Sequence, residues 1–168
     1  MGWFFGLKYH LLINQYGEIL NFRITSANVA DNDTKLLFQL TQELYGWIFG
    51  DKGYLLNSDK RVFLERDGAI RFFTKVRKNM KKQDIPFEAQ SWLGKRPIIE
   101  TVIGLTKSQC DVAHSRHRSA ANAFGNILVG LVAYSYSQRK PIASINLEKR
   151  LLQEPKAVYM KLKEQQAA

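Results

Sequence analysis

The first fifty residues alternate apolar and polar positions in a pattern typical of a β-hairpin followed by a helix. Residues 7–14 and 19–25 are predicted to form two strands, because a polar turn that contains glycine separates them. Gly46 is expected to end the helix that follows. The apolar residues that predict this helix recur at helical spacing: Leu36, Leu37, Leu40 and Leu44.

Three polar residues of this region are predicted to be structural. Asp31 and Asp33 precede the helix and could be mistaken for catalytic acids, but capping of the helix N-terminus is the simpler interpretation. His10 lies in the middle of the first strand, where a histidine is more often a packed or edge residue than a catalyst.

The middle of the chain continues with strand, helix and strand. An apolar strand at residues 47–50 is followed by Asp51, and Asn57 or Ser58 is predicted to cap a helix that runs to about residue 66. Another strand is expected at residues 69–76. The order strand, strand, helix, strand, helix, strand predicts an α/β fold.

The second half of the chain is predicted to be helical. Residues 83–94 are interpreted as a linker, and a helix over residues 95–107 would have Pro97 in its first turn, where the missing N–H costs nothing. Residues 120–135 predict a buried apolar helix. The chain turns polar at residue 138, so residues 1–137 are expected to form one domain and 138–168 a helical or frayed tail.

The helix at residues 95–107 combines a charged face with an apolar one. At ~100° per residue, Arg96, Glu100 and Lys107 lie within ~40° of each other. A surface helix with an ordinary Arg–Glu pair is the alternative, although Glu before Lys or Arg is the more favourable order. The other side carries the apolar residues Ile98, Ile99, Val102, Ile103 and Leu105.

Asp51 is a second candidate for a functional acid. A carboxylate at the end of a buried strand lies at the carboxyl edge of the sheet, where α/β proteins place their sites. The alternative is an ordinary turn formed by Asp51, Lys52 and Gly53.

The composition favours a polyanionic partner. The 168 residues are 45% hydrophobic, which argues against disorder, and they include 25 Lys+Arg against 15 Asp+Glu, a net charge of +10. Nucleic acid is the first expectation and an anionic membrane surface the second. The single Cys110 excludes an internal disulfide framework. The apolar run at residues 124–136 is too short to span a bilayer.

Two groups of basic residues are candidate phosphate contacts, with a solvated surface as the alternative for both. A metal site at His114 and His117 is disfavoured, because no carboxylate or cysteine is near them in the sequence. The first group lies in an acid-free stretch after a predicted strand: Arg71, Lys75, Arg77, Lys78, Lys81 and Lys82. The second group is Arg116, His117 and Arg118.

The acid at the strand end and the charged helix together resemble the motifs of bacterial insertion-sequence DDE transposases. In that family a strand-terminal Asp is followed by Gly-Tyr, as Asp51 is followed here by Gly53 and Tyr54. A later helix carries Arg, three residues, Glu, six residues and Lys, which is the spacing of the charged face described above. The segments at residues 2–10, with the histidine, and 114–119 are also similar, so the resemblance covers about residues 2–137.

The resemblance implies a ribonuclease-H-like mixed sheet with flanking helices, followed by C-terminal helices. It implies that Asp51 and Glu100 hold Mg²⁺ (or Mn²⁺), and that Arg96 and Lys107 bind DNA phosphate beside the metal. Tyr54 would orient a phosphate or pack under the loop. The implied activity is cleavage at a transposon end and strand transfer into target DNA, by a cytoplasmic, nucleoid-associated protein whose partner is double-stranded DNA and whose homo-oligomeric state stays open.

One part of the family pattern is expected to be missing. The first catalytic Asp of the family lies on a strand before the segment that corresponds to residues 2–6, so we expect an N-terminally truncated catalytic domain that is inactive alone. A DNA-binding remnant that cannot cut is the alternative. An unrelated basic protein for ribosome or membrane contact is disfavoured by the Arg96, Glu100 and Lys107 spacing.

Overall fold

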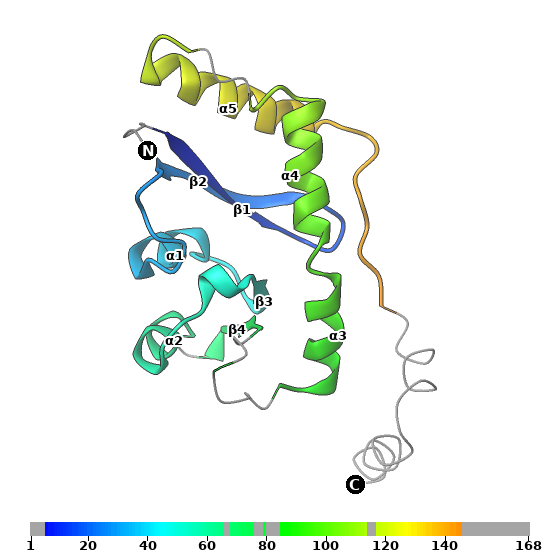
Figure 1. Cartoon of the computed structure of the whole chain (residues 1–168). Helices are drawn as coiled ribbons and strands as arrows, with labels where there is room; N and C mark the ends of the chain where they lie inside the picture. The colour runs from blue at the N-terminus through cyan, green and yellow to red at the C-terminus, as the bar shows by residue number, and fades with distance from the viewer. Residues whose placement is uncertain (1–5, 66–67, 76–78, 80–84, 114–116, 146–168) are drawn as a thin grey trace, which may run out of the picture.

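The computed structural model describes residues 6–65, 68–75, 79, 85–113 and 117–145. Its helices and strands follow the predicted order as far as the second parallel strand and then continue with helices (Figure 1). The elements are β1 (Leu7–Ile13), β2 (Ile19–Ser26), α1 (Thr34–Leu40), β3 (Gly46–Gly50), η1 (Lys52–Tyr54), α2 (Ser58–Leu64), β4 (Ile70–Thr74), α3 (Phe87–Lys95), α4 (Ile98–Ser108) and α5 (Ala120–Ser135).

The predicted hairpin is confirmed. Strands β1 and β2 pair antiparallel, with His10 opposite Arg23. The turn forms because the Asn14 side chain accepts hydrogen bonds from the backbone N–H groups of Tyr16 and Glu18, and because Gly17 adopts a φ of +70°, which glycine tolerates without strain.

The expected single mixed sheet is not formed by the strands that the structure describes. Strand β3 pairs parallel with β4, from Gly46 opposite Ile70 to Gly50 opposite Thr74, and this pair is separate from the hairpin. Each of β1 and β3 therefore has one neighbour among the described strands and leaves its other edge unpaired. A mixed sheet would need a further strand between β1 and β3.

The larger differences from the sequence-based prediction concern helices α1, α3 and α4. Helix α1 ends at Leu40, before Gly46, because the Thr41 side chain donates to the Leu37 carbonyl and Glu43 takes a positive φ of 64°. The expected linker at residues 83–94 contains helix α3, which was missed because its buried positions are small or polar as often as apolar. Pro97 lies at the N-cap of α4 and not in its first turn.

Buried apolar residues hold these elements together in three groups. The two faces of the β3–β4 sheet carry different groups, since successive side chains on a strand point to opposite sides. One face packs on α1 and α2, and the other on α3, as Figure 1 shows. The group toward α1 and α2 is Leu37, Leu56, Leu64, Ile70 and Phe72, and the group toward α3 is Phe73, Ala89 and Leu93.

The third group joins the hairpin to α5. The Tyr134 hydroxyl of α5 donates to the Gly17 carbonyl at 2.7 Å, and the backbone N–H of Ala143 donates to Gln15, so the chain after α5 also contacts the hairpin turn. The described part of the polar tail, residues 138–145, has no helix, and residues 146–168 lie outside the described part. No described helix is long and apolar enough to cross a membrane. The buried residues of the group that joins the hairpin to α5 are Val112, Ile127 and Leu131.

Two glycines of α5 give a matched test of this packing. A Cβ at Gly130 would lie 2.7 Å from the Cys110 carbonyl oxygen and would clash with the Val112 side chain, whereas a Cβ at Gly125 would meet nothing within 4 Å. We expect Gly130→Ala to lower the free energy of unfolding by ~1–3 kcal/mol. Gly125→Ala should raise it by up to ~1 kcal/mol, because alanine favours a helix. Urea denaturation of both variants measures this, and equal effects would contradict the close approach of α5 to residues 110–112.

Candidate active site

Asp51 lies where the sequence places it, directly after β3. The parallel pairing with β4 brings the carboxyl ends of both strands to one edge of this sheet, so Lys75, which follows β4, lies at the same edge. The Asp51 side chain caps the short helix η1 by accepting from the backbone N–H of Lys52 at 2.6 Å. The cap fixes the carboxylate at the sheet edge and leaves the residue exposed.

Arg96 joins Asp51 to the second predicted acid, Glu100. Its guanidinium Nη1 lies 2.5 Å from Asp51 Oδ1, and its Nη2 lies 3.9 Å from Glu100 Oε1. Arg96 lies at the junction of α3 and α4, before the first residue of α4. The structure thus brings together three of the residues predicted from the sequence, from β3, the helix junction and α4.

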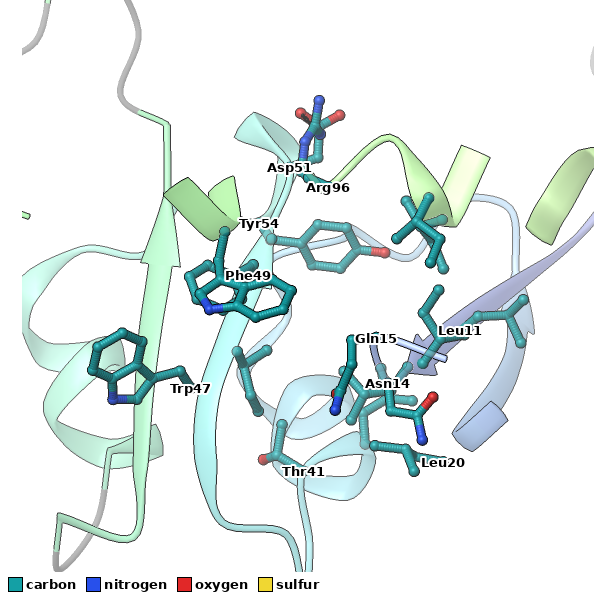
Figure 2. Close-up of a pocket in the computed structure, with 18 of the residues that line it drawn as sticks. Leu11, Asn14, Gln15, Leu20, Thr41, Trp47, Phe49, Asp51, Tyr54 and Arg96 are labelled. Atoms are coloured by element: carbon teal, nitrogen blue, oxygen red, sulfur yellow. Dashed lines mark ion pairs between the residues drawn. The ribbon is translucent and has the colours of Figure 1, made fainter. Parts of the chain in front are cut away.

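The bridging arginine is more buried than the acids it contacts. The Arg96 side chain is 20% exposed, against 59% for Asp51 and 69% for Glu100. In Figure 2, Arg96 lies against Asp51 at one end of a cavity, and the Tyr54 ring extends across it. The cavity has a volume of about 590 Å³. The acids therefore stand at a water-accessible rim with a partly buried cation behind them.

Tyr54 belongs to a buried polar network that the sequence did not reveal. Its hydroxyl lies 3.4 Å from His10 Nδ1, and His10 Nε2 lies 3.0 Å from the Thr25 hydroxyl. Burial, with the nearby charges of Asp31 and Asp51, raises the pKa of Tyr54 to about 12. The tyrosine hydroxyl therefore keeps its proton at neutral pH and is available as a hydrogen-bond donor.

His10 is almost fully buried, with 2% of its surface exposed. Burial lowers the pKa of His10, Asp31 opposes this shift, and Lys8 adds to it. The imidazole is therefore neutral at pH 7. This burial fits the prediction that His10 is a packed residue of the strand. The contact with Tyr54 also connects the hairpin to the turn after Asp51.

Only one of the two predicted capping acids caps α1. Asp33 accepts from the backbone N–H of Leu36 at 2.8 Å, as expected. Asp31 instead pairs with Lys8 at 3.1 Å, so its predicted role was wrong. A Cβ on Gly53 would meet the Asp31 carboxylate at 3.2 Å, which places this acid against η1. No spacing signal in the sequence marks this contact, because it joins a strand, a loop and a turn.

The structure does not bring Lys107 to the two acids. It lies seven residues beyond Glu100, about 10 Å along the same helix, and is exposed on the face that Glu100 shares. Among the other predicted DNA contacts, Arg71, Lys75 and Arg118 are exposed and His117 is partly buried. The remaining ones lie outside the described residues: Arg77, Lys78, Lys81, Lys82 and Arg116.

The carboxylates of Asp51 and Glu100 have the chemistry of a Mg²⁺ site. Mg²⁺ prefers hard oxygen ligands, keeps several waters and is usually held through one or two carboxylates together with phosphate. Both side chains are more than half exposed, so a cation could replace Arg96 between them. Within the described part of the chain, no group of three or more His, Cys, Asp or Glu residues could hold a metal. The residues thus fit an ion that is held weakly until phosphate joins it.

One comparison with known proteins gave a match over most of the chain. The family model described as Transposase DDE domain matches residues 1–120, a range that contains Asp51, Arg96 and Glu100. A search of curated proteins and a search of solved structures gave no match.

The buried histidine predicts a pH-dependent stability. Because the folded-state pKa of His10 lies below its unfolded value near 6.5, the unfolded chain binds more protons in this range, and the free energy of unfolding should fall as the pH drops from 7 to 5. His10→Asn should reduce this fall, while Tyr54→Phe, which leaves His10 buried, should keep it. Urea denaturation at both pH values measures the difference. An equal fall in the wild type and in His10→Asn would show that other groups cause it.

Proposed function

Because the chain belongs to the transposase DDE domain family, we propose that it carries part of a catalytic centre for DNA transposition, in which Asp51 and Glu100 hold Mg²⁺ or Mn²⁺. The observation that carries this proposal is the convergence of the two acids on Arg96 from β3 and α4. The reaction is cleavage of a DNA strand at a transposon end, followed by attack of the freed 3′-hydroxyl on a target strand. The fold that supports it is a ribonuclease-H-like one, of which β1–β2, β3–β4 and the flanking helices form the described part.

The chemistry divides between the cation and the side chains around it. A divalent ion bound by the carboxylates supplies positive charge to the attacked phosphate and lowers the pKa of bound water. Asp51 is already oriented by its bond to the Lys52 N–H, and Tyr54, on the same short turn, packs beneath it with its hydroxyl 3.4 Å from His10 Nδ1. These side chains are therefore held in place before DNA arrives.

Arg96 has two successive roles in this proposal. Without the ion, it balances the charge of the two carboxylates, which would otherwise repel each other across the rim. With the ion bound, the guanidinium is released to a DNA phosphate, a ligand whose geometry it matches in two hydrogen bonds. Lys107, further along α4, and Lys75, at the carboxyl edge of β3–β4, extend the cationic surface away from the acids.

A DNA-binding domain that does not cut is the second candidate. It is favoured by the absence of a third acidic, histidine or cysteine ligand beside the two acids within the described residues. The two candidates share their DNA contacts and differ in the cation. Mn²⁺ binding that is lost in the double variant Asp51→Asn, Glu100→Gln supports the first candidate, and tight DNA binding without such Mn²⁺ binding supports the second.

The proposed metal site predicts that different substitutions change the Mn²⁺ affinity in opposite directions. Isothermal titration with Mn²⁺ should detect weak binding that the double variant Asp51→Asn, Glu100→Gln abolishes. Arg96→Gln should strengthen binding, because the competing cation is removed. The double variant Asp59→Asn, Glu88→Gln removes the same charge from exposed positions on α2 and α3 and should bind as the wild type does. Identical titrations for all four proteins would refute the site.

DNA binding is expected to be independent of sequence and strongly dependent on salt, because the chain carries a net charge of +10. Replacement of Arg77, Lys78, Lys81 and Lys82 by alanine should flatten the slope of log K against log salt by ~0.9 for each phosphate that the variant no longer neutralises. Lys35→Ala, an exposed change on α1, should leave the slope unchanged. Fluorescence anisotropy with a labelled duplex across a salt series measures both, and an unchanged slope in the fourfold variant would mean that this run is only a solvated surface.

A further inference from the structure

The turn η1, which Asp51 caps, is too short to fix its own position. It has three residues, none of them buried, and its backbone bonds run from the Tyr54 N–H to the Asp51 carbonyl at 2.9 Å and from the Leu55 N–H to the Lys52 carbonyl at 3.4 Å. A single helical turn is not stable in isolation, because fixing its dihedral angles costs more free energy than its few hydrogen bonds contribute. The position of the turn beyond the end of β3 therefore depends on the residues that it packs against.

The loop between β2 and α1 supports this turn. The carboxylate of Asp31, in the loop, lies against Gly53 of η1. Strand β1 holds the loop in place, because Lys8 Nζ lies 3.1 Å from Asp31 Oδ1 and donates to the Val29 carbonyl at 3.0 Å. His10, also on β1, has its Nδ1 3.9 Å from the same carboxylate oxygen. The hairpin therefore positions Asp31, and Asp31 contacts the turn.

Gly53 provides space for Asp31 and not a special backbone conformation. Its φ is not positive, in contrast to Gly17, Gly46 and Gly68. A Cβ at Gly53 would lie 3.2 Å from Asp31 Oδ2, which is closer than ordinary van der Waals contact, and 3.8 Å from Asp31 Cβ, which is an ordinary contact. The carboxylate of Asp31 is thus the group that a side chain at this position would displace, or that would displace the turn.

A displacement of Gly53 would reach the Asp51 carboxylate through the backbone between them. The N–H of Lys52, the residue that joins the two, donates to Asp51 Oδ1 at 2.6 Å. The same oxygen contacts Arg96, whose guanidinium also reaches Glu100. The placement of the two acids relative to each other therefore depends on where the turn is held.

We propose that Asp31 is a positioning residue for the metal site, because its carboxylate, packed against Gly53, sets the position of η1 and so of Asp51. The inference rests on the proposed function in assigning the ion to Asp51 and Glu100. Asp31 acts through the turn and not as a ligand, in agreement with the absence, among the described residues, of any group of three His, Cys, Asp or Glu that could hold a metal. Changes to residues that hold metal ligands in place typically lower the affinity by about 10–100-fold.

A double-mutant cycle between residues 31 and 53 tests the proposal. Gly53→Ala should weaken Mn²⁺ binding by about tenfold, because the added methyl group meets the Asp31 carboxylate and moves the turn. Asp31→Ala should weaken it to a similar extent, because the turn loses its support. In the Asp31→Ala background, Gly53→Ala should change the affinity by less than about twofold, since the carboxylate is gone. Water-proton relaxation measures these weak Mn²⁺ affinities.

The control adds the same methyl group far from the turn. Gly125→Ala on α5 meets nothing within 4 Å and should bind Mn²⁺ as the wild type does. Urea denaturation without metal gives the stability of every variant. If the substitutions at residues 31 and 53 lower only the free energy of unfolding and leave the Mn²⁺ affinity of the folded chain unchanged, Asp31 is a structural residue and the proposal is wrong. Independent effects, with the double variant weakened about a hundredfold, would also overturn it.

A readout without metal separates this proposal from the proposed function. The hydrogen bond from Lys52 to Asp51 should shift the Lys52 amide proton downfield in ¹H–¹⁵N spectra. Gly53→Ala should move this signal upfield, and the addition of Asp31→Ala to that variant should move it back. If the signal responds in this way but the wild type binds no Mn²⁺, the proposed function fails and the positioning by Asp31 stands. A Lys52 signal that is the same in Gly53→Ala and in the double variant would refute the positioning.

Discussion

The parallel pairing of β3 with β4 is the constraint on which the charged centre depends. Parallel strands end at the same side of a sheet, so the residues that follow Gly50 and Thr74 come to one edge, and the connection between the strands must cross over as η1 and α2. The other face of the pair holds α3, whose end at Lys95 places Arg96 opposite Asp51. The position of the acid and of its cationic partner thus follows from one pair of strands and the helices packed on its two faces.

The ion pairs at this centre position charged side chains but contribute little to the stability of the fold. An exposed ion pair typically contributes ~0–1 kcal/mol, and Asp51 and Glu100 are both more than half exposed. The three buried apolar groups contribute far more, since each large side chain removed from water is worth ~1.5–3 kcal/mol. The charges of Asp51, Arg96 and Glu100 can therefore be rearranged by a ligand at small cost to stability.

The buried polar contacts act differently from the exposed ion pairs. His10 is held between Tyr54 and Thr25 with almost none of its surface exposed, and a buried polar group that loses its partner costs ~1–3 kcal/mol. The hairpin is thus joined to the turn after Asp51 by contacts that are costly to break. On the other side of the hairpin, Tyr9 lies 3.2 Å from the Thr106 hydroxyl of α4. The hairpin therefore contacts both of the segments that carry the two acids.

Local patterns in the sequence predicted most of the elements and the candidate residues of the site. Alternation and turn chemistry predicted the hairpin, Asp33 and Asn57 were recognisable as helix caps, and the spacing of Arg96 and Glu100 predicted their contact, because each of these features is settled by residues a few positions apart. Only the tertiary structure decided that Arg96 bridges to Asp51, that Asp31 pairs with Lys8, and that the described strands form two sheets with a cavity between them. The two ion pairs join residues 23 and 45 positions apart, and the sheet arrangement depends on which strand edges meet. Neither can be predicted from a periodic pattern along the chain. The helix α3 was missed for a related reason, since what buries Ala89 and Ser91 is the face of β3–β4 and not an apolar pattern of their own.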